Sequence, residues 1–348
     1  MIRRLACVLA LAGCATADGG MAHPPTTPMA SESAPLAVEE FRVPARDAGI
    51  ELYVRNKHPR DVSRFAPEKI LLFVHGSTYP AEATFDLPLG GVSWMEWIAQ
   101  RGYDVYLVDV RGYGRSTRPR EMSEPPQAHG PIVTTEVAIS DVGSAVDFIL
   151  RRRSVPKLTL MGWSWGTTTM GAYTARNNDK VARLVLYAPQ WLRTTPSLIS
   201  GEGAWRAVSM DSARDRWLKG VPEDKRRDLI PDGWFEVWAK ATLESDPEGA
   251  RATPPMIRAP NGTLHDTREF WAAGKPFYDP GQIKVPTLIV HADLDQDLPT
   301  PMARAVFEKL TSAPRKRFVE IGDGTHTILM EKNRLQLFRE VQLFLDSE

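Results

Sequence analysis

The sequence predicts an α/β fold in which a mostly parallel central sheet carries helices on both faces. Apolar runs of strand length alternate with segments of helical periodicity, and several of these runs are continuous, as in strands buried on both faces. The chain has 348 residues, 43% of them hydrophobic, which is enough to bury a sizeable core. Its 43 basic and 43 acidic side chains give no net charge. A nucleic-acid-binding protein usually carries a basic excess, so we expect no nucleic-acid partner.

The first residues have the outline of a secretory signal peptide. The basic pair Arg3-Arg4 precedes an apolar run that ends in Leu11-Ala12-Gly13-Cys14. This ending resembles the bacterial lipoprotein box, which implies removal of residues 1–13, lipidation of Cys14 and export to a membrane surface that faces the periplasm. An ordinary signal peptide, an unstructured start and translation from Met21 or Met29 are the alternatives.

Residues 14–37 are rich in alanine, proline, threonine and serine, a composition typical of a flexible tether. No apolar run reaches the roughly 18 residues of a membrane span, so Cys14 is the one membrane contact that we expect. Cys7 is the only other cysteine. Two cysteines exclude a disulfide-stapled fold and a cysteine-rich metal site, and a mature chain without a free thiol suits an oxidising compartment.

The predicted core comprises residues 38–190 and 280–348. Alternating or continuous apolar runs predict strands at residues 41–43, 50–54, 70–74, 105–108, 158–161, 184–187, 287–290 and 317–321. Helices are predicted at residues 94–100, 138–149, 167–177, 302–310 and 335–345. The second of these helices has the clearest apolar stripe, formed by Ala138, Val142, Ala145, Val146 and Ile149.

Residues 191–279 interrupt this alternation. The interruption holds six of the ten tryptophans, namely Trp191, Trp205, Trp217, Trp234, Trp238 and Trp271, and is therefore not a disordered linker. We interpret it as a mostly helical lid folded over the edge of the sheet. Its aromatic side chains are candidates for a substrate pocket, but aromatic stripes belong more often to a core. The substrate-binding residues are therefore left unassigned.

The strongest motif is Gly162-Trp163-Ser164-Trp165-Gly166, which lies between a predicted strand and a predicted helix. This is the context of a Gly-x-Ser-x-Gly nucleophile elbow, a turn so tight that glycine is needed on both sides. The turn would present the Ser164 hydroxyl at the carboxyl edge of the sheet, as a nucleophile. The alternative is a glycine-rich turn with an idle serine.

A serine nucleophile needs a base, and the base needs a carboxylate that orients it. His326 lies in the loop between the last strand and the last helix, where a rigid scaffold can hold a solvent-reachable base. Three carboxylates in one loop, Asp293, Asp295 and Asp297, are candidates for the orienting acid. A calcium loop is excluded because its sixth position would be Leu298 rather than glycine.

The chain order of nucleophile, acid and base is that of the α/β-hydrolase fold, and the resemblance extends from about residue 38 to the C-terminus. His75-Gly76 resembles the oxyanion-loop motif of this family, and the Asp-Val-Arg-Gly-Tyr-Gly-Arg-Ser of residues 109–116 resembles its D-x-R-G-x-G-x-S turn. In the family, the acid often lies four residues before a proline. Asp295 stands in that relation to Pro299, so the resemblance favours Asp295 as the orienting acid.

Two backbone donors are expected to stabilise the oxyanion of a tetrahedral intermediate. One is the N–H of Trp165, directly after the nucleophile, and the other is the N–H of Ser77, in the loop after the third strand. Arg111, Gly112 and Gly114 are interpreted as buttresses of the neighbouring turn. The two glycines lack the third glycine of a dinucleotide-binding motif, and no metal-binding spacing occurs. We therefore expect neither a cofactor nor a metal.

Within this family, dehalogenases and epoxide hydrolases carry aspartate at the elbow, so Ser164 favours acyl transfer. The resemblance implies a serine hydrolase that cleaves small-molecule carboxylic esters through an acyl-enzyme. The elbow also resembles that of proline iminopeptidases, although residues 75–79 (His-Gly-Ser-Thr-Tyr) depart from their His-Gly-Gly-Pro-Gly. An aminopeptidase of that kind is the alternative, and a non-catalytic binding member of the fold is a second one.

Overall fold

The computed structural model describes residues 35–347. The predicted signal segment 1–13, the lipidation site Cys14 and most of the predicted tether lie outside this range. One correction concerns the end of the tether. Strand β1 (Leu36–Pro44) begins inside the predicted tether 14–37, because its first residues pair with the end of β2 (Glu51–Pro59).

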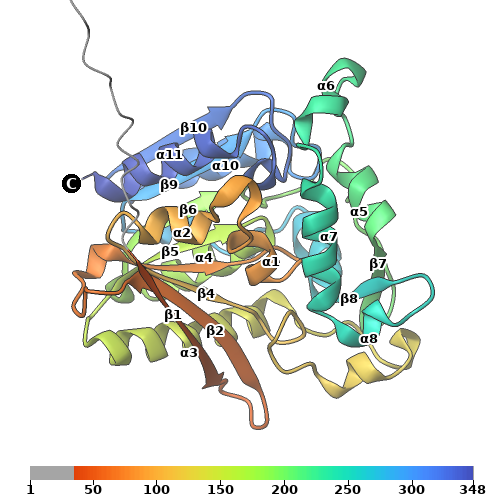
Figure 1. The fold of residues 1–348 in the computed structure, drawn as a ribbon, viewed down its shortest axis with the longest axis horizontal. Coiled ribbons are helices and arrows are strands. Elements are labelled where there is room, and N and C mark those ends of the chain that lie inside the picture. The colour runs from red at the N-terminus through yellow and green to blue at the C-terminus, as the bar shows by residue number, and fades with distance from the viewer. Residues whose placement is uncertain (1–34, 348) are drawn as a thin grey trace, which may run out of the picture. The chain divides into compact units, whose positions relative to one another are not determined.

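Eight strands form one sheet in the order β1-β2-β4-β3-β5-β6-β9-β10 (Figure 1). The remaining bounds are β3 (Ile70–Val74), β4 (Asp104–Val108), β5 (Leu158–Trp163), β6 (Val181–Tyr187), β9 (Thr287–Ala292) and β10 (Lys316–Ile321). The β1–β2 and β2–β4 pairs are antiparallel, and the other five pairs are parallel. The predicted fold class, a mostly parallel sheet between helices, is confirmed.

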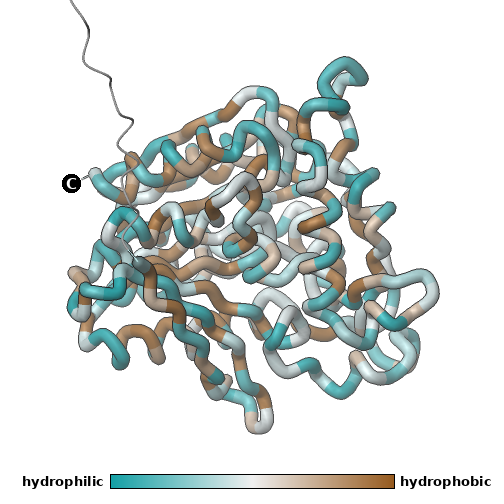
Figure 2. The backbone as a smooth tube through the Cα atoms, in the orientation of Figure 1, coloured by the Kyte–Doolittle hydropathy of each residue, from teal (hydrophilic) through white to brown (hydrophobic). Residues whose placement is uncertain are grey.

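Helices cover both faces of the sheet. Strand β3 is buried along its whole length, with Ile70, Leu72 and Val74 in one apolar cluster and Leu71 and Phe73 in the other. The first cluster receives α3 (Thr135–Arg153), α4 (Trp165–Arg176) and α10 (Thr300–Lys309). The second receives α1 (Ala81–Phe85), α2 (Trp94–Ala99) and α11 (Arg334–Asp346). Figure 2 shows the apolar residues concentrated in the central strands, as strands buried on both faces require.

The segment between β6 and β9 contains five α-helices and a second sheet. The helices are α5 (Met210–Trp217), α6 (Glu223–Leu229), α7 (Trp234–Glu244), α8 (Pro247–Ala250) and α9 (Gly262–Asp266). The second sheet pairs β7 (Trp205–Ser209) with β8 (Met256–Pro260) in antiparallel fashion. We did not predict this pair, because its strands lie far apart in the chain and no hairpin turn links them. Trp217 and Trp238 pack edge to face, 5.4 Å apart, inside the second apolar cluster.

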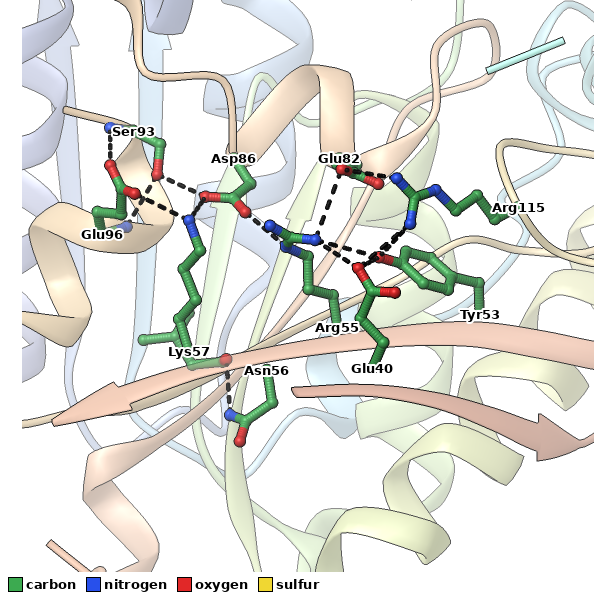
Figure 3. A network of polar contacts seen from close by, with 11 residues as sticks. Glu40, Tyr53, Arg55, Asn56, Lys57, Glu82, Asp86, Ser93, Glu96 and Arg115 are labelled. Atoms are coloured by element: carbon green, nitrogen blue, oxygen red, sulfur yellow. Dashed lines mark hydrogen bonds and ion pairs between the residues drawn. The ribbon is translucent and has the colours of Figure 1, made fainter. Parts of the chain in front are cut away.

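A network of ion pairs ties the antiparallel edge of the sheet to α1 and α2 (Figure 3). The side chain of Asp86 has no exposed surface and contacts Arg55 Nε and Lys57 Nζ, each at 2.7 Å, and the Ser93 hydroxyl at 2.7 Å. Arg55 continues the network to Glu40 at 2.6 Å. Because each buried charge has an opposite charge beside it, the network can stay out of water.

Candidate active site

The turn after β5 has the strained geometry of a nucleophile elbow. Ser164 has φ 58° and ψ −124°, a left-handed conformation that residues with a Cβ rarely adopt. A Cβ on Gly162 would lie 2.2 Å from the carbonyl oxygen of Gly166, and a Cβ on Gly166 would lie 2.6 Å from that of His75. Both flanking glycines are therefore required by close backbone approach. The turn places Ser164 at the carboxyl end of β5, directly before α4.

Of the three candidate carboxylates, Asp295 is the one that contacts His326. The distance between His326 Nδ1 and Asp295 Oδ2 is 2.8 Å, and Asp295 Oδ1 accepts a hydrogen bond from the Leu298 N–H at 2.9 Å. Burial alone would raise the pKa of Asp295, but the charge and hydrogen bond of His326 outweigh it and hold the pKa below its usual value. Asp293 instead accepts from the Gly324 N–H at 3.3 Å.

Ser164 and His326 line the same pocket, although they lie far apart in the sequence. Both are nearly buried, at 8% and 6% exposure. The backbone carbonyl of His326 accepts hydrogen bonds from Trp163 Nε1 at 3.0 Å and from the Tyr187 hydroxyl at 2.7 Å. The loop that carries the imidazole is thus held by β5 and β6, the strands on which the elbow is built.

The loop after β3 approaches the elbow closely. A Cβ on Gly76 would lie 3.1 Å from the Ser164 Cβ, so a larger residue would press on the serine. The next residue, Ser77, lines the pocket. Its carbonyl accepts hydrogen bonds from the Tyr113 hydroxyl at 2.9 Å and from Arg206 Nη2 at 2.7 Å. These two donors hold the Ser77–Thr78 peptide, which directly follows the residue whose N–H is the expected donor.

The second expected donor, the Trp165 N–H, lies in the first turn of α4. The first N–H groups of a helix have no acceptor within the helix, and the helix dipole adds positive potential there. Ser77 lines the pocket with Ser164, and Trp165 follows Ser164 directly in the chain, so both stay candidates for the two oxyanion donors.

The remaining motif residues support these loops. His75 is fully buried, donates from Nδ1 to the Gly76 carbonyl at 2.6 Å, and accepts from the Val110 N–H through Nε2 at 3.1 Å. The Nε2 acceptor requires a neutral ring with its proton on Nδ1. Burial lowers the pKa of His75 to about 4, which agrees with that state. The Arg111 guanidinium pairs with the buried Asp141 at 2.5 Å.

The segment between β6 and β9 contributes polar residues that our sequence analysis did not select. Arg206 on β7 and Arg216 on α5 both contact the Thr78 hydroxyl, at 3.0 Å and 3.3 Å. The Arg216 Nε also donates to both carboxylate oxygens of Asp297, at 3.0 Å and 2.8 Å. No spacing in the sequence marks these arginines, because they approach the loop after β3 only through the fold.

Glu331 is another residue that the sequence analysis missed. Its buried carboxylate accepts hydrogen bonds from the Thr325 N–H at 3.0 Å, from the Thr325 hydroxyl and from Trp217 Nε1 at 2.7 Å. The Thr327 hydroxyl lies 3.4 Å away. Glu331 therefore holds the residues on both sides of His326 and joins them to α5. Burial raises the pKa of Glu331 to about 7, although the hydrogen bonds oppose that shift.

Among residues 35–347, no cluster of three or more histidine, cysteine or acidic side chains could hold a metal ion. No helix in the same range is long and apolar enough to cross a membrane.

The chain belongs to the alpha/beta hydrolase fold family, whose model matches residues 69–333. A proline iminopeptidase from Arabidopsis thaliana is 29% identical over 150 residues, which cover 43% of this chain and 36% of that protein. The match thus spans about a third of the length of that relative.

Solved structures share the fold. A serine hydrolase involved in carbazole degradation superimposes with a TM-score of 0.59 at 18% identity and covers 89% of this chain and 99% of its own. A thermophilic esterase from Thermogutta terrifontis gives a TM-score of 0.55 at 18% identity, with 89% and 100% covered. These neighbours share the fold, and the family supports a hydrolase.

Proposed function

We propose that the protein is a serine hydrolase that cleaves carboxylic esters through an acyl-enzyme intermediate. One observation carries the proposal. His326, whose Nδ1 lies 2.8 Å from Asp295 Oδ2, lines a pocket together with Ser164, which has the strained conformation of a nucleophile elbow. In this proposal Ser164 is the nucleophile, His326 the general base and acid, and Asp295 the carboxylate that orients the imidazole.

The reaction follows from these roles. Asp295 accepts the Nδ1 proton of His326, which leaves Nε2 free to take the proton of the Ser164 hydroxyl as the oxygen attacks the ester carbonyl. The oxyanion binds to the N–H groups of Ser77 and Trp165. His326 then gives its proton to the departing alcohol. Water enters, loses a proton to His326 and releases the acid from Ser164. Water is consumed, and one acid and one alcohol are formed.

The geometry favours an ester hydrolase over an aminopeptidase. A site for a free amino terminus needs a carboxylate that faces the bound substrate. Asp297 is the one carboxylate among the residues that line the cavities beside Ser164, and Arg216 holds both of its oxygens. An incoming ammonium group would have to displace that arginine.

The test is an assay of the full chain on nitrophenyl esters of increasing acyl length, beside prolyl nitroanilide. Ser164→Ala is the control for background hydrolysis. We expect ester turnover that disappears in the variant. A preference for the prolyl amide would favour the aminopeptidase, and ester turnover that survives in Ser164→Ala would remove Ser164 from the mechanism.

We further propose that lipidation of Cys14 anchors the enzyme to a membrane that faces the periplasm. The resemblance of the Leu-Ala-Gly-Cys segment to a lipoprotein box supports this. Cys14→Ser should move the full-length protein from the membrane fraction to the soluble fraction of a bacterial host. Membrane association that persists in the variant would contradict the anchor.

A further inference from the structure

The pocket beside Ser164 has two lobes with different chemistry. Ser77, Ser164, Arg216 and Asp297 border both lobes. The first lobe is completed mainly by aromatic side chains and by the base, namely Tyr79, Trp163, Trp217 and His326. The second lobe is completed mainly by polar side chains, namely Gln190, Arg193, Ser197, Thr263 and Thr267.

The second lobe carries an excess of positive charge. Two arginines line it, against the single carboxylate of Asp297. Asp297 is neutralised by Arg216, whose pKa it raises against the opposing effect of burial. Arg193 donates to the backbone carbonyls of Thr195, Pro196 and Asp297, at 3.3, 3.1 and 3.0 Å, and has no ion pair among residues 35–347. One positive charge therefore remains unpaired in the lobe.

Both arginines have N–H donors that the contacts above do not use. Within the described part of the chain, Nη1 of Arg193 and Nη2 of Arg216 donate to no acceptor, while their other nitrogens are held as described above. Those bonds fix the two guanidinium groups without using all their N–H groups. Fixed, partly desolvated guanidinium donors suit a carboxylate, which can accept from both.

The position of His326 decides which half of an ester enters the second lobe. The base must reach the oxygen of the leaving alcohol, and His326 lines the first lobe but not the second. The alcohol therefore departs through the first lobe, and the acyl chain extends from Ser164 into the second.

We propose that the second lobe is a carboxylate-binding subsite, formed by Arg193 and Arg216, for the far end of the acyl group. The preferred substrates are then monoesters of short dicarboxylic acids. Hydrolysis adds one water and yields the dicarboxylic acid and the alcohol. This proposal rests on ester hydrolysis at Ser164 for its choice of substrate, but the subsite itself can be tested by binding alone.

The binding test uses full-chain Ser164→Ala, which cannot form an acyl-enzyme. Ligand-observed NMR titration compares monoethyl glutarate with ethyl pentanoate, which has the same acyl chain length and no charge. We expect monoethyl glutarate to bind at least tenfold more tightly, and Arg193→Gln or Arg216→Gln in this background to weaken it about tenfold. Arg214→Gln is the control, because Arg214 is an exposed residue of the same helix as Arg216 and does not line the lobe.

The kinetic test measures kcat/KM of the wild-type chain for the same two esters. We expect at least a tenfold preference for monoethyl glutarate, which falls about tenfold in Arg193→Gln and is unchanged in Arg214→Gln. Damage to the elbow or to the fold would lower kcat/KM for both esters alike. The ratio of the two kcat/KM values therefore reports on the subsite alone.

The outcomes distinguish the two proposals. Equal cleavage of both esters would overturn the subsite and leave the serine hydrolase standing. Arginine-dependent binding without any ester hydrolysis would overturn the hydrolase and leave the subsite standing. If monoethyl glutarate is neither bound nor cleaved better than ethyl pentanoate, the carboxylate subsite is wrong whatever the enzyme hydrolyses.

Discussion

Two clusters of charged side chains, one at the antiparallel edge of the sheet and one at the pocket, differ in how the charges are paired. In the network of Figure 3, the cations Arg55, Lys57 and Arg115 each contact at least one carboxylate within 3.3 Å. At the pocket, Arg206 and Arg193 hydrogen-bond to carbonyl oxygens and have no carboxylate partner among residues 35–347.

The difference separates charges that support the fold from charges that can act on a substrate. A paired buried charge has little field left for a ligand, whereas an unpaired one costs desolvation and keeps its field. Burial accordingly lowers the pKa of Arg206 to about 10, so the guanidinium remains charged at neutral pH. Its guanidinium contacts the carbonyl of Ser77, the residue whose N–H is one of the two proposed oxyanion donors. The comparison predicts that variants in the two clusters have opposite effects on stability and activity.

The largest effect is expected at the proposed triad. His326→Ala should lower kcat for the best nitrophenyl ester by about 10⁴-fold or more, because the serine loses its base. The free energy of unfolding, measured by denaturant titration, should change far less than the activity. Activity close to wild type in a folded His326→Ala protein would remove this residue from the triad.

Asp86→Ala should produce the reverse pattern. Removing this buried carboxylate leaves Arg55 and Lys57 desolvated without their shared partner, so the free energy of unfolding should fall by about 3–5 kcal/mol. The protein that stays folded should retain its kcat. Asp61→Ala, at an exposed position in the loop after β2, serves as the control and should change stability by about 0.5 kcal/mol or less. Equal stability of the two variants would show that the network contributes nothing.

Arg206→Met tests the unpaired cation directly. We expect kcat/KM to fall about 10–100-fold for every ester, because the Ser77–Thr78 peptide, which follows the expected Ser77 donor, loses one of its own donors. Stability should change less than in Asp86→Ala, since the lost desolvation cost of the buried charge offsets the hydrogen bonds that the Pro260 and Ser77 carbonyls lose. Circular dichroism and denaturant titration check the fold. A loss of stability with kcat/KM unchanged would assign Arg206 to the structural class of charges.

Glu331 belongs to neither of the two clusters of charges. The pH dependence of stability should reveal its protonation state. Its folded-state pKa of about 7 lies above the 4.5 of the free side chain. Both states are protonated at low pH, so this carboxyl costs no stability there. As the pH rises from 4.5 to 7, the unfolded chain ionises while the folded carboxyl keeps its proton, so stability falls, and the loss is complete once the pH exceeds the folded-state pKa of about 7.

The comparison with Glu331→Gln isolates this effect. The amide of Glu331→Gln cannot ionise. The free energy of unfolding of this variant, minus that of the wild type, should therefore rise by about 2 kcal/mol between pH 5 and pH 8. Denaturant titrations of both proteins across that range measure the difference. A difference that does not change with pH would mean that Glu331 is ionised throughout and acts as an ordinary acceptor.

Much of the architecture was predictable because it depends on local periodicity. Continuous apolar runs such as residues 70–74 became strands buried on both faces, and the stripe of residues 138–149 became part of α3. The antiparallel pair β7–β8 was missed for a physical reason. Its paired residues lie about fifty positions apart in the chain, so no turn residue or short-range pattern indicates the pairing.

The residues of the candidate site likewise divide into those that the local sequence indicates and those that only the fold brings together. The sequence by itself determined the elbow around Ser164, because the glycines on both sides are dictated by contacts within a few residues. It also narrowed the acid to one loop and singled out His326. Only the tertiary structure decided that Asp295 contacts His326, and that Arg193, Arg206, Arg216 and Glu331 surround the serine and the base. These contacts join separate elements across the sheet edge, and the charge that remains unpaired there depends on every neighbour at once.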